Sequence, residues 1–160
     1  MKIFISILLL LSLSLCACSA PRYTSGLSCE EITSALYESL LDSQLYAKYS
    51  ETDVRHKFSD TELYGDASVV YSISSDDISE VGVLKAKETQ STDELLDEVL
   101  DYIEDLKDEK QEFLKSYLPS ELNKLNFAEA RAFGPYVVYT VLGADNAEEV
   151  FSFAKELLSE

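Results

Sequence analysis

The sequence predicts an α+β domain, and two observations carry that prediction. Apolar residues recur with helical periodicity near residues 29–45, 92–116 and 145–158. Pairs of β-branched or apolar runs lie between these helices, each pair separated by a short turn-like segment. The resulting order is α-β-β-α-β-β-α. We expect a four-stranded, largely antiparallel sheet packed with helices.

The first helix is expected over residues 29–45. Ser28 and Glu31 have the spacing of a capping box, which satisfies two backbone N–H groups at a helix start. One face of the helix is apolar: Ile32, Ala35, Leu36, Leu40 and Leu41. This segment therefore begins the domain as an amphipathic helix.

The next stretch is polar and weakly periodic. Residues 47–59 are interpreted as loop or frayed helix, and Asp60 as the cap of a short helical turn that ends at Gly65. Two strands follow, near residues 67–73 and 80–87. The serine and aspartate residues between them are typical of a turn.

The second half of the chain begins with a long helix over residues 92–116, for which Ser91 and Glu94 form a second expected capping box. Pro119 suits the first turn of a short helix, "PSELNKL".

The last hairpin is predicted around Gly134 and Pro135, between "AEARAF" and "YVVYTVLG". Both alternating faces of the second run are apolar, which indicates a central strand covered on both sides. Asp145 and Glu148 are interpreted as the cap of the final helix.

The start of the chain has the pattern of an export signal. Lys2 precedes an apolar run that is too short for the roughly 20 residues of a spanning helix. Leu15 and Ala17 stand where lipoprotein cleavage wants an aliphatic and a small residue before Cys18, whereas Leu15 is too bulky to precede Cys16.

We therefore predict a signal peptide over residues 1–17, a lipidated Cys18 with a tether to residue 26, and one domain over 27–160. Two acyl chains hold a protein stably at a bilayer, where one chain is marginal. Cleavage without lipidation at Ala17-Cys18-Ser19 is the alternative. The expected location is the outer face of a bacterial cell membrane.

Charge limits the choice of partners. Only Lys2 of the 13 Lys and Arg lies in the predicted signal, so 12 basic residues remain against 30 Asp and Glu, a formal charge of −18. Such a surface repels phosphate backbones and anionic headgroups, which argues against nucleic acid and against direct adsorption to lipid. A basic envelope protein or another polycation is the expected kind of partner.

The quoted elements resemble a family of bacterial lipoproteins defined by the domain of unknown function 4358. The resemblance covers most of residues 27–158 and is carried by "ELYG", "EVGVLKAK", "YLPSELNKLNFAEARAFGPYVVYTV" and the helix around Phe151. It implies a lipid anchor and one domain, and it transfers no catalytic residue. Within it, Pro119 and Gly134 are backbone positions, and Tyr117, Tyr136 and Val137 are interpreted as packing residues.

Candidate chemistry is sparse in this sequence. His56, the single histidine, is expected in an exposed loop, which leaves no histidine-rich metal site. Cys29 is interpreted as a small apolar residue of the first helical turn, with a reactive or intermolecular thiol as the alternative.

Acidic residues on the long helix and tyrosines throughout the chain are both numerous in this sequence. The acidic face of the long helix is interpreted as solvated, because carboxylates on a straight helix diverge. Five tyrosines are expected in the core with their hydroxyls at its rim, or else in a peptide or glycan groove: Tyr64, Tyr71, Tyr117, Tyr136 and Tyr139.

The first functional hypothesis is a non-enzymatic binding or accessory module of the cell envelope, without cofactor or metal. A carboxylate-dependent envelope hydrolase and a small solute-binding lipoprotein are the alternatives. An enzyme or receptor is expected to show a pocket with convergent polar groups, and an interaction module a broad, shallow patch.

Overall fold

The computed structural model describes residues 22–24, 26–41, 44–88 and 91–160. The predicted signal peptide and Cys18 lie outside these residues. Within them the chain forms five helices and a five-stranded antiparallel sheet, so the predicted α+β class is confirmed. The elements are α2 (Cys29–Leu40), β1 (Tyr46–Lys48), α3 (Glu51–Lys57), β2 (Tyr64–Ser72), β3 (Glu80–Ala86), α4 (Thr92–Tyr117), α5 (Leu122–Asn126), β4 (Glu129–Phe133), β5 (Tyr136–Val141) and α6 (Ala144–Leu158).

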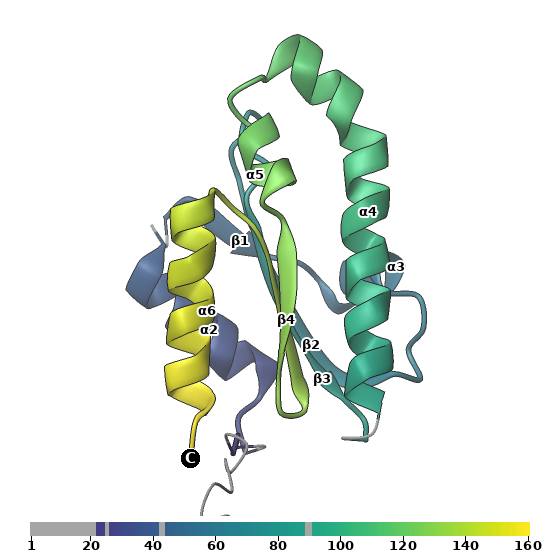
Figure 1. The fold of residues 1–160 in the computed structure, drawn as a ribbon, viewed down its shortest axis with the longest axis vertical. Coiled ribbons are helices and arrows are strands. Elements are labelled where there is room, and N and C mark those ends of the chain that lie inside the picture. Colours follow the sequence, from purple (N-terminus) through teal and green to yellow (C-terminus); the bar gives the residue numbers. More distant parts are fainter. Residues whose placement is uncertain (1–21, 25, 42–43, 89–90) are drawn as a thin grey trace, which may run out of the picture.

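The sheet has the strand order β1-β2-β3-β5-β4, and all its neighbours are antiparallel. Helices α2 and α6 cover one face and α4 covers the other, so that the domain has three layers (Figure 1). The expectation of four strands was wrong, because β1 adds a fifth strand by pairing with β2. A strand of three residues is too short to show a periodic pattern.

The segment interpreted as loop or frayed helix, residues 47–59, contains most of β1 and all of α3. Helix α3 is capped by Ser50, whose side chain accepts from the Asp53 N–H while the Asp53 carboxylate accepts from the Ser50 N–H. This is a capping box, a local signal that fits the short helix that follows. The helical turn expected after Asp60 is only a turn, since β2 already begins at Tyr64.

The first core lies between the sheet and helices α2 and α6. The capping box of α2 is confirmed: the Ser28 N–H donates to Glu31 over 2.8 Å, and the Glu31 N–H donates back to the Ser28 hydroxyl over 3.2 Å. The apolar faces of both helices meet strand residues in one cluster, which includes Ile32, Leu36, Val81, Val83, Val138, Val150, Phe151 and Leu158.

The second core lies between the sheet and α4. Leu95, Val99 and Ile103 of α4 are buried against the opposite face of the strands, together with Phe58 and Tyr139. Gly82 allows this packing, because a Cβ there would stand 2.0 Å from the Tyr139 ring. The close approach of ring and backbone is possible only where β3 has no side chain.

Strand β5 is an interior strand, as predicted. It lies between β3 and β4, and all six of its residues are buried. The hairpin to β4 turns at Gly134, which has a φ of +60° that favours glycine. Within the described residues, the buried Thr140 hydroxyl has no hydrogen-bond partner.

Two predicted helix caps were wrong. Ser91 precedes α4 but its side chain makes no capping bond, and its hydroxyl donates to the Glu88 carbonyl instead. Helix α6 begins at Ala144 behind Gly143, so Asp145 already lies inside the first helical turn. There its negative charge still suits the positive end of the helix dipole.

The two described ends of the chain lie together. Tyr23 forms an isolated antiparallel bridge with Ser159, and the Thr24 N–H donates to the Leu158 carbonyl over 2.8 Å. The Tyr23 ring also packs edge-on against Phe133, beside the Gly134 turn. In the described part of the chain, no helix combines the length and apolarity needed to cross a bilayer.

Candidate functional site

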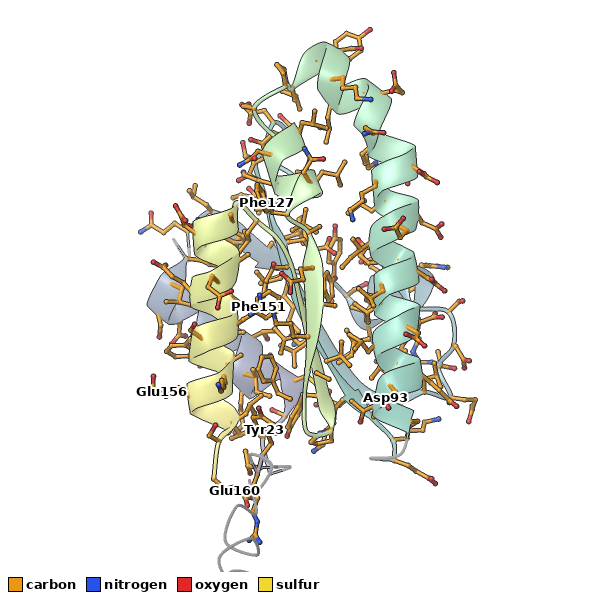
Figure 2. The ribbon with its side chains drawn as sticks, viewed as in Figure 1. Tyr23, Asp93, Phe127, Phe151, Glu156 and Glu160 are labelled. Atoms are coloured by element: carbon orange, nitrogen blue, oxygen red, sulfur yellow. The ribbon has the colours of Figure 1, made fainter. Side chains whose placement is uncertain are left out.

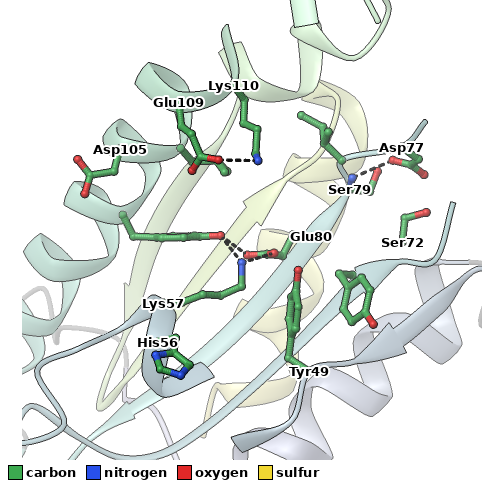
Figure 3. A pocket seen from close by; sticks show the side chains of 14 residues that line it. Tyr49, His56, Lys57, Ser72, Asp77, Ser79, Glu80, Asp105, Glu109 and Lys110 are labelled. Carbon is green, nitrogen blue, oxygen red and sulfur yellow. Dashed lines mark hydrogen bonds and ion pairs between the residues drawn. The ribbon is translucent and has the colours of Figure 1, made fainter. Parts of the chain in front are cut away.

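A cleft of about 510 Å³ opens between α4 and the end of the sheet where β2 stops and β3 starts (Figure 3). Its volume lies within the range of small-molecule sites. The end of β2, the start of β3 and the segment between them supply its floor. Helix α3 and the segment before it supply one wall, and the middle of α4 supplies another.

Glu80 is the central polar group of the cleft. It begins β3, is only 6% exposed, and points to the α4 side of the sheet. Its Oε1 accepts hydrogen bonds from the hydroxyls of Tyr139 (2.6 Å) and Tyr102 (2.8 Å). A buried carboxylate is tolerated where such donors replace water.

Lys57 supplies the matching positive charge from the last turn of α3. Its ammonium donates to Oε2 of Glu80 over 3.0 Å and to the Tyr102 hydroxyl over 2.7 Å. The same nitrogen lies 4.5 Å from the ring centre of Tyr49 and 4.9 Å from that of Tyr102, both within cation–π range. Figure 3 shows Lys57 reaching between Tyr49 and α4 towards Glu80.

The tyrosines of this network act as hydrogen-bond donors. Burial is the main cause that raises the pKa values of Tyr49, Tyr102 and Tyr139 above the usual range of tyrosine. The nearby Glu80 carboxylate raises them further. These tyrosines therefore keep their protons at neutral pH. Both oxygens of Glu80 are occupied by donors, which suits a group that holds the cleft in shape rather than one that exchanges protons.

A second ionic cluster closes one end of the cleft. Lys124 of α5 donates to Asp77 (2.7 Å) and pairs with Glu121 (2.8 Å), and the Glu121 carboxylate accepts from the Ile78 N–H. Burial alone raises the pKa of Asp77, but hydrogen bonds from Lys124 and Ser79 lower it to about 2. These contacts fasten the segment between β2 and β3 to α5.

The open side of the cleft combines aromatic and acidic groups. The rings of Tyr49 and Tyr71 stack at 4.0 Å between centres. Opposite them, Asp105 and Glu109 project from α4, and Glu109 pairs with Lys110 over 2.7 Å. Among all the lining residues, four carboxylates stand against two lysines, so the cleft carries net negative charge.

A second hollow of about 520 Å³ lies beside α3 and carries charges of both signs. Each of its three basic side chains already forms a surface ion pair: Lys48 with Glu30, Arg55 with Glu51, and Lys87 with Glu62. Exposed pairs of this kind contribute little to stability or recognition. The cleft around Glu80, with its buried network, is the better candidate site.

The predicted histidine and cysteine roles are partly confirmed. His56 is exposed, but it lies in α3 rather than in a loop, at the edge of the cleft. Cys29 is fully buried in the first turn of α2, as interpreted, and burial followed by the nearby Asp66 raises the pKa of its thiol. In the described ranges, no three His, Cys, Asp or Glu residues are grouped to hold a metal ion.

The predicted core positions are confirmed for some of the five tyrosines and wrong for others. Tyr64 and Tyr136 are buried and donate to the carbonyls of Phe58 and Leu27, and buried Tyr139 donates to Glu80. Tyr71 is half-buried at the cleft. Tyr117 was wrongly placed in the core: it is 72% exposed.

The acidic face of α4 is largely exposed, as expected, except that Glu98 is half-buried. Asp105 and Glu109, although exposed, also line the cleft.

Sequence reasoning missed Glu80, Lys57, Tyr49 and Tyr102. One signal was available: Glu80 is an acidic residue at the start of an apolar β-branched run, and Gly82 two residues later marks a close approach on the same face. An acidic side chain in a buried strand needs hydrogen-bond donors or a positive charge beside it. The residues near Glu80 in the sequence do not indicate which side chains supply them.

The family model for a domain of unknown function, DUF4358, matches residues 47–142. The match is narrower than the resemblance expected over residues 27–158. It contains every residue of the cleft and leaves out helices α2 and α6. No curated protein and no solved structure matches the chain.

Proposed function

The chain belongs to the DUF4358 family, a domain of unknown function, and from that premise we propose that it is a lipid-anchored binding module on the outer face of a bacterial cell membrane. Leu15 and Ala17 before Cys18 support the anchor. The surplus of 17 negative charges over the whole chain supports a basic partner rather than nucleic acid or bare lipid.

The observation that carries the proposal is the position of the cleft relative to the chain's entry into the fold. Residues 22–24 join the domain beside Ser159 and the Gly134 turn. Glu80 lies at the opposite end of β3, across from Val141, whereas Lys85 pairs with Tyr136 next to that turn.

Glu80 and Lys85 are five steps apart along the strand, roughly 17 Å at about 3.4 Å per step. A tether at the entry would thus attach to the domain at the end of β3 opposite to the cleft. That arrangement suits the capture of a partner from the envelope space.

Binding fits the cleft better than catalysis does. Glu80 is the group that a carboxylate-dependent hydrolase would use, but its two oxygens already accept from Tyr102, Tyr139 and Lys57. A general acid or base must instead be able to reach a substrate proton. The alternative of a small solute-binding lipoprotein would use the same cleft. It differs from the proposed module only in the size of the ligand.

The anchor is tested by detergent partitioning of two matched cysteine variants. Cys18→Ala removes the proposed acylation site and is expected to shift the protein out of the detergent phase. Cys16→Ala, two residues away, is expected to leave partitioning unchanged. Equal loss in both variants would refute the assignment of Cys18.

The binding role is tested by pull-down from envelope extract at low and high salt, beside an assay for release of wall fragments. Basic partners are expected to be retained at low salt and lost as the screening length falls from about 10 Å at 0.1 M to about 3 Å at 1 M. Release of wall fragments by the purified protein would overturn the non-enzymatic proposal.

A further inference from the structure

The cleft already holds one alkylammonium group, that of Lys57. Its nitrogen is in contact with a carboxylate, a hydroxyl and two aromatic rings, those of Glu80, Tyr102 and Tyr49. This combination is what proteins use to hold organic cations. The chain's own lysine thus shows what kind of group this wall accommodates.

Beyond Lys57, the described part of the cleft has one carboxylate without a cationic partner, that of Asp105. Lys57 neutralises Glu80, and Lys110 pairs with Glu109. Asp105 lines the same space, and in the described part of the chain no hydrogen bond or ion pair engages its carboxylate. Figure 3 shows Asp105 and Glu109 on adjacent turns of α4, above the Glu80 and Lys57 pair.

The apolar surface of the cleft fits an alkyl chain. The stacked rings of Tyr49 and Tyr71 form its wall opposite α4, and Ile78 and Leu106 add aliphatic surface. Methylene groups can lie along such surfaces while the charged end remains at the carboxylates. The combination of aromatic wall and acidic edge distinguishes this cleft from a merely acidic surface.

We propose that the cleft binds a primary ammonium group carried on a flexible alkyl chain, with the chain along Tyr49 and Tyr71 and the ammonium at Asp105 and Glu109. The chemistry is shared by polyamines and by lysine side chains of a basic protein. The inference deepens the proposed binding function by naming its site and the group that it recognises.

The test is isothermal titration calorimetry of the full chain, purified in a non-ionic detergent, at low salt. The probes are spermidine and acetyl-trilysine amide, and the control ligand is the same peptide with its three side chains acetylated. Both cationic probes, or one of them, are expected to bind, and the acetylated peptide is not. Binding of spermidine alone identifies small polyamines as the source, and binding of the peptide alone identifies lysine side chains.

The site is located with two double variants of α4, each of which removes two negative charges. Asp105→Asn with Glu109→Gln changes the cleft, whereas Asp108→Asn with Glu104→Gln changes the helix outside it. Each pair contains one Asp and one lysine-paired Glu, since Glu104 pairs with Lys107 as Glu109 pairs with Lys110. The cleft variant is expected to weaken binding at least fivefold and the control variant less than twofold.

The aromatic wall is tested by Tyr71→Leu, which keeps the charge of the cleft and is expected to weaken binding severalfold. Circular dichroism of each variant verifies the fold. Failure of both cationic probes to bind, or equal weakening in the two double variants, would overturn the proposal. Either result would leave the anchor at Cys18 standing, because detergent partitioning tests that assignment separately.

Discussion

Gly82→Ala tests how tightly the Tyr139 ring is held over β3. A Cβ at residue 82 would stand 2.0 Å from Cε1, 2.6 Å from Cζ and 2.8 Å from Cδ1 of that ring. Ordinary contact begins at 3.4 Å, so the ring or the strand must move. The ring is fully buried and packs edge-on against Phe58 and Tyr102, which leaves it no open space to enter.

The cost has two parts. Overpacking of a well-filled core costs about 1–3 kcal/mol. Displacement of Tyr139 also breaks its 2.6 Å hydrogen bond to Glu80, and a hydrogen bond to a charged group contributes about 1.5–3 kcal/mol. We therefore expect the free energy of unfolding to fall by about 2.5–6 kcal/mol, a large share of the 5–15 kcal/mol typical of a domain.

Urea unfolding followed by circular dichroism measures this loss. Gly65→Ala is the matched control, because its added Cβ would meet Lys87 at ordinary contact distances, 3.4 Å from Cγ and 3.9 Å from Cα, and removing a strand glycine is neutral or slightly stabilising. Tyr139→Leu in the Gly82→Ala background makes room, so the double variant is expected to lose less than the sum of the single ones. A wild-type unfolding midpoint for Gly82→Ala would refute this account of the core.

Two further predictions concern stability. Val138→Asp places a charge in an interior strand where Val138 is fully buried, and it is expected to cost several kcal/mol; an unchanged urea midpoint would contradict the central placement of β5. For Asp77, the pKa of about 2 against an ordinary 3.8 means that its ionised form stabilises the fold above about pH 4. This contribution is lost as the pH falls towards 2. Allowing for partial exposure, we expect Asp77→Asn to cost about 1 kcal/mol at pH 7 and almost nothing at pH 2. Urea melts at both pH values measure the difference, and a cost that does not change with pH would be inconsistent with it.

Local signals predicted much of the fold. The capping box at Ser28, the long apolar stripe of α4 and the turn at Gly134 each depend on residues that are close in sequence, and all three predictions are confirmed. The caps expected at Ser91 and Asp145 were wrong because the same residue spacing also occurs where the chain makes no capping bond. Spacing permits a cap, but the backbone geometry decides it.

Burial on a helix face was harder to predict at the end of α4. Tyr117 continues the apolar spacing of the helix, yet α4 runs beyond the sheet at that end (Figure 2). The exposed Tyr117 ring packs against Phe113, which is also exposed. Periodicity shows which face of a helix is apolar. It does not show how far the opposing layer extends.

The sequence by itself determined the α+β class and the net negative charge, and it predicts the anchor at Cys18, because each depends on composition or on neighbours along the chain. Only the tertiary structure decided the candidate site. Lys57, Glu80 and Tyr102 come from a short helix, a strand and a long helix, and pairing across the sheet adds Tyr139 beside Gly82. Each of these residues has an ordinary structural interpretation alone. Burial forces them together, because a carboxylate removed from water must find its hydrogen-bond donors inside the fold.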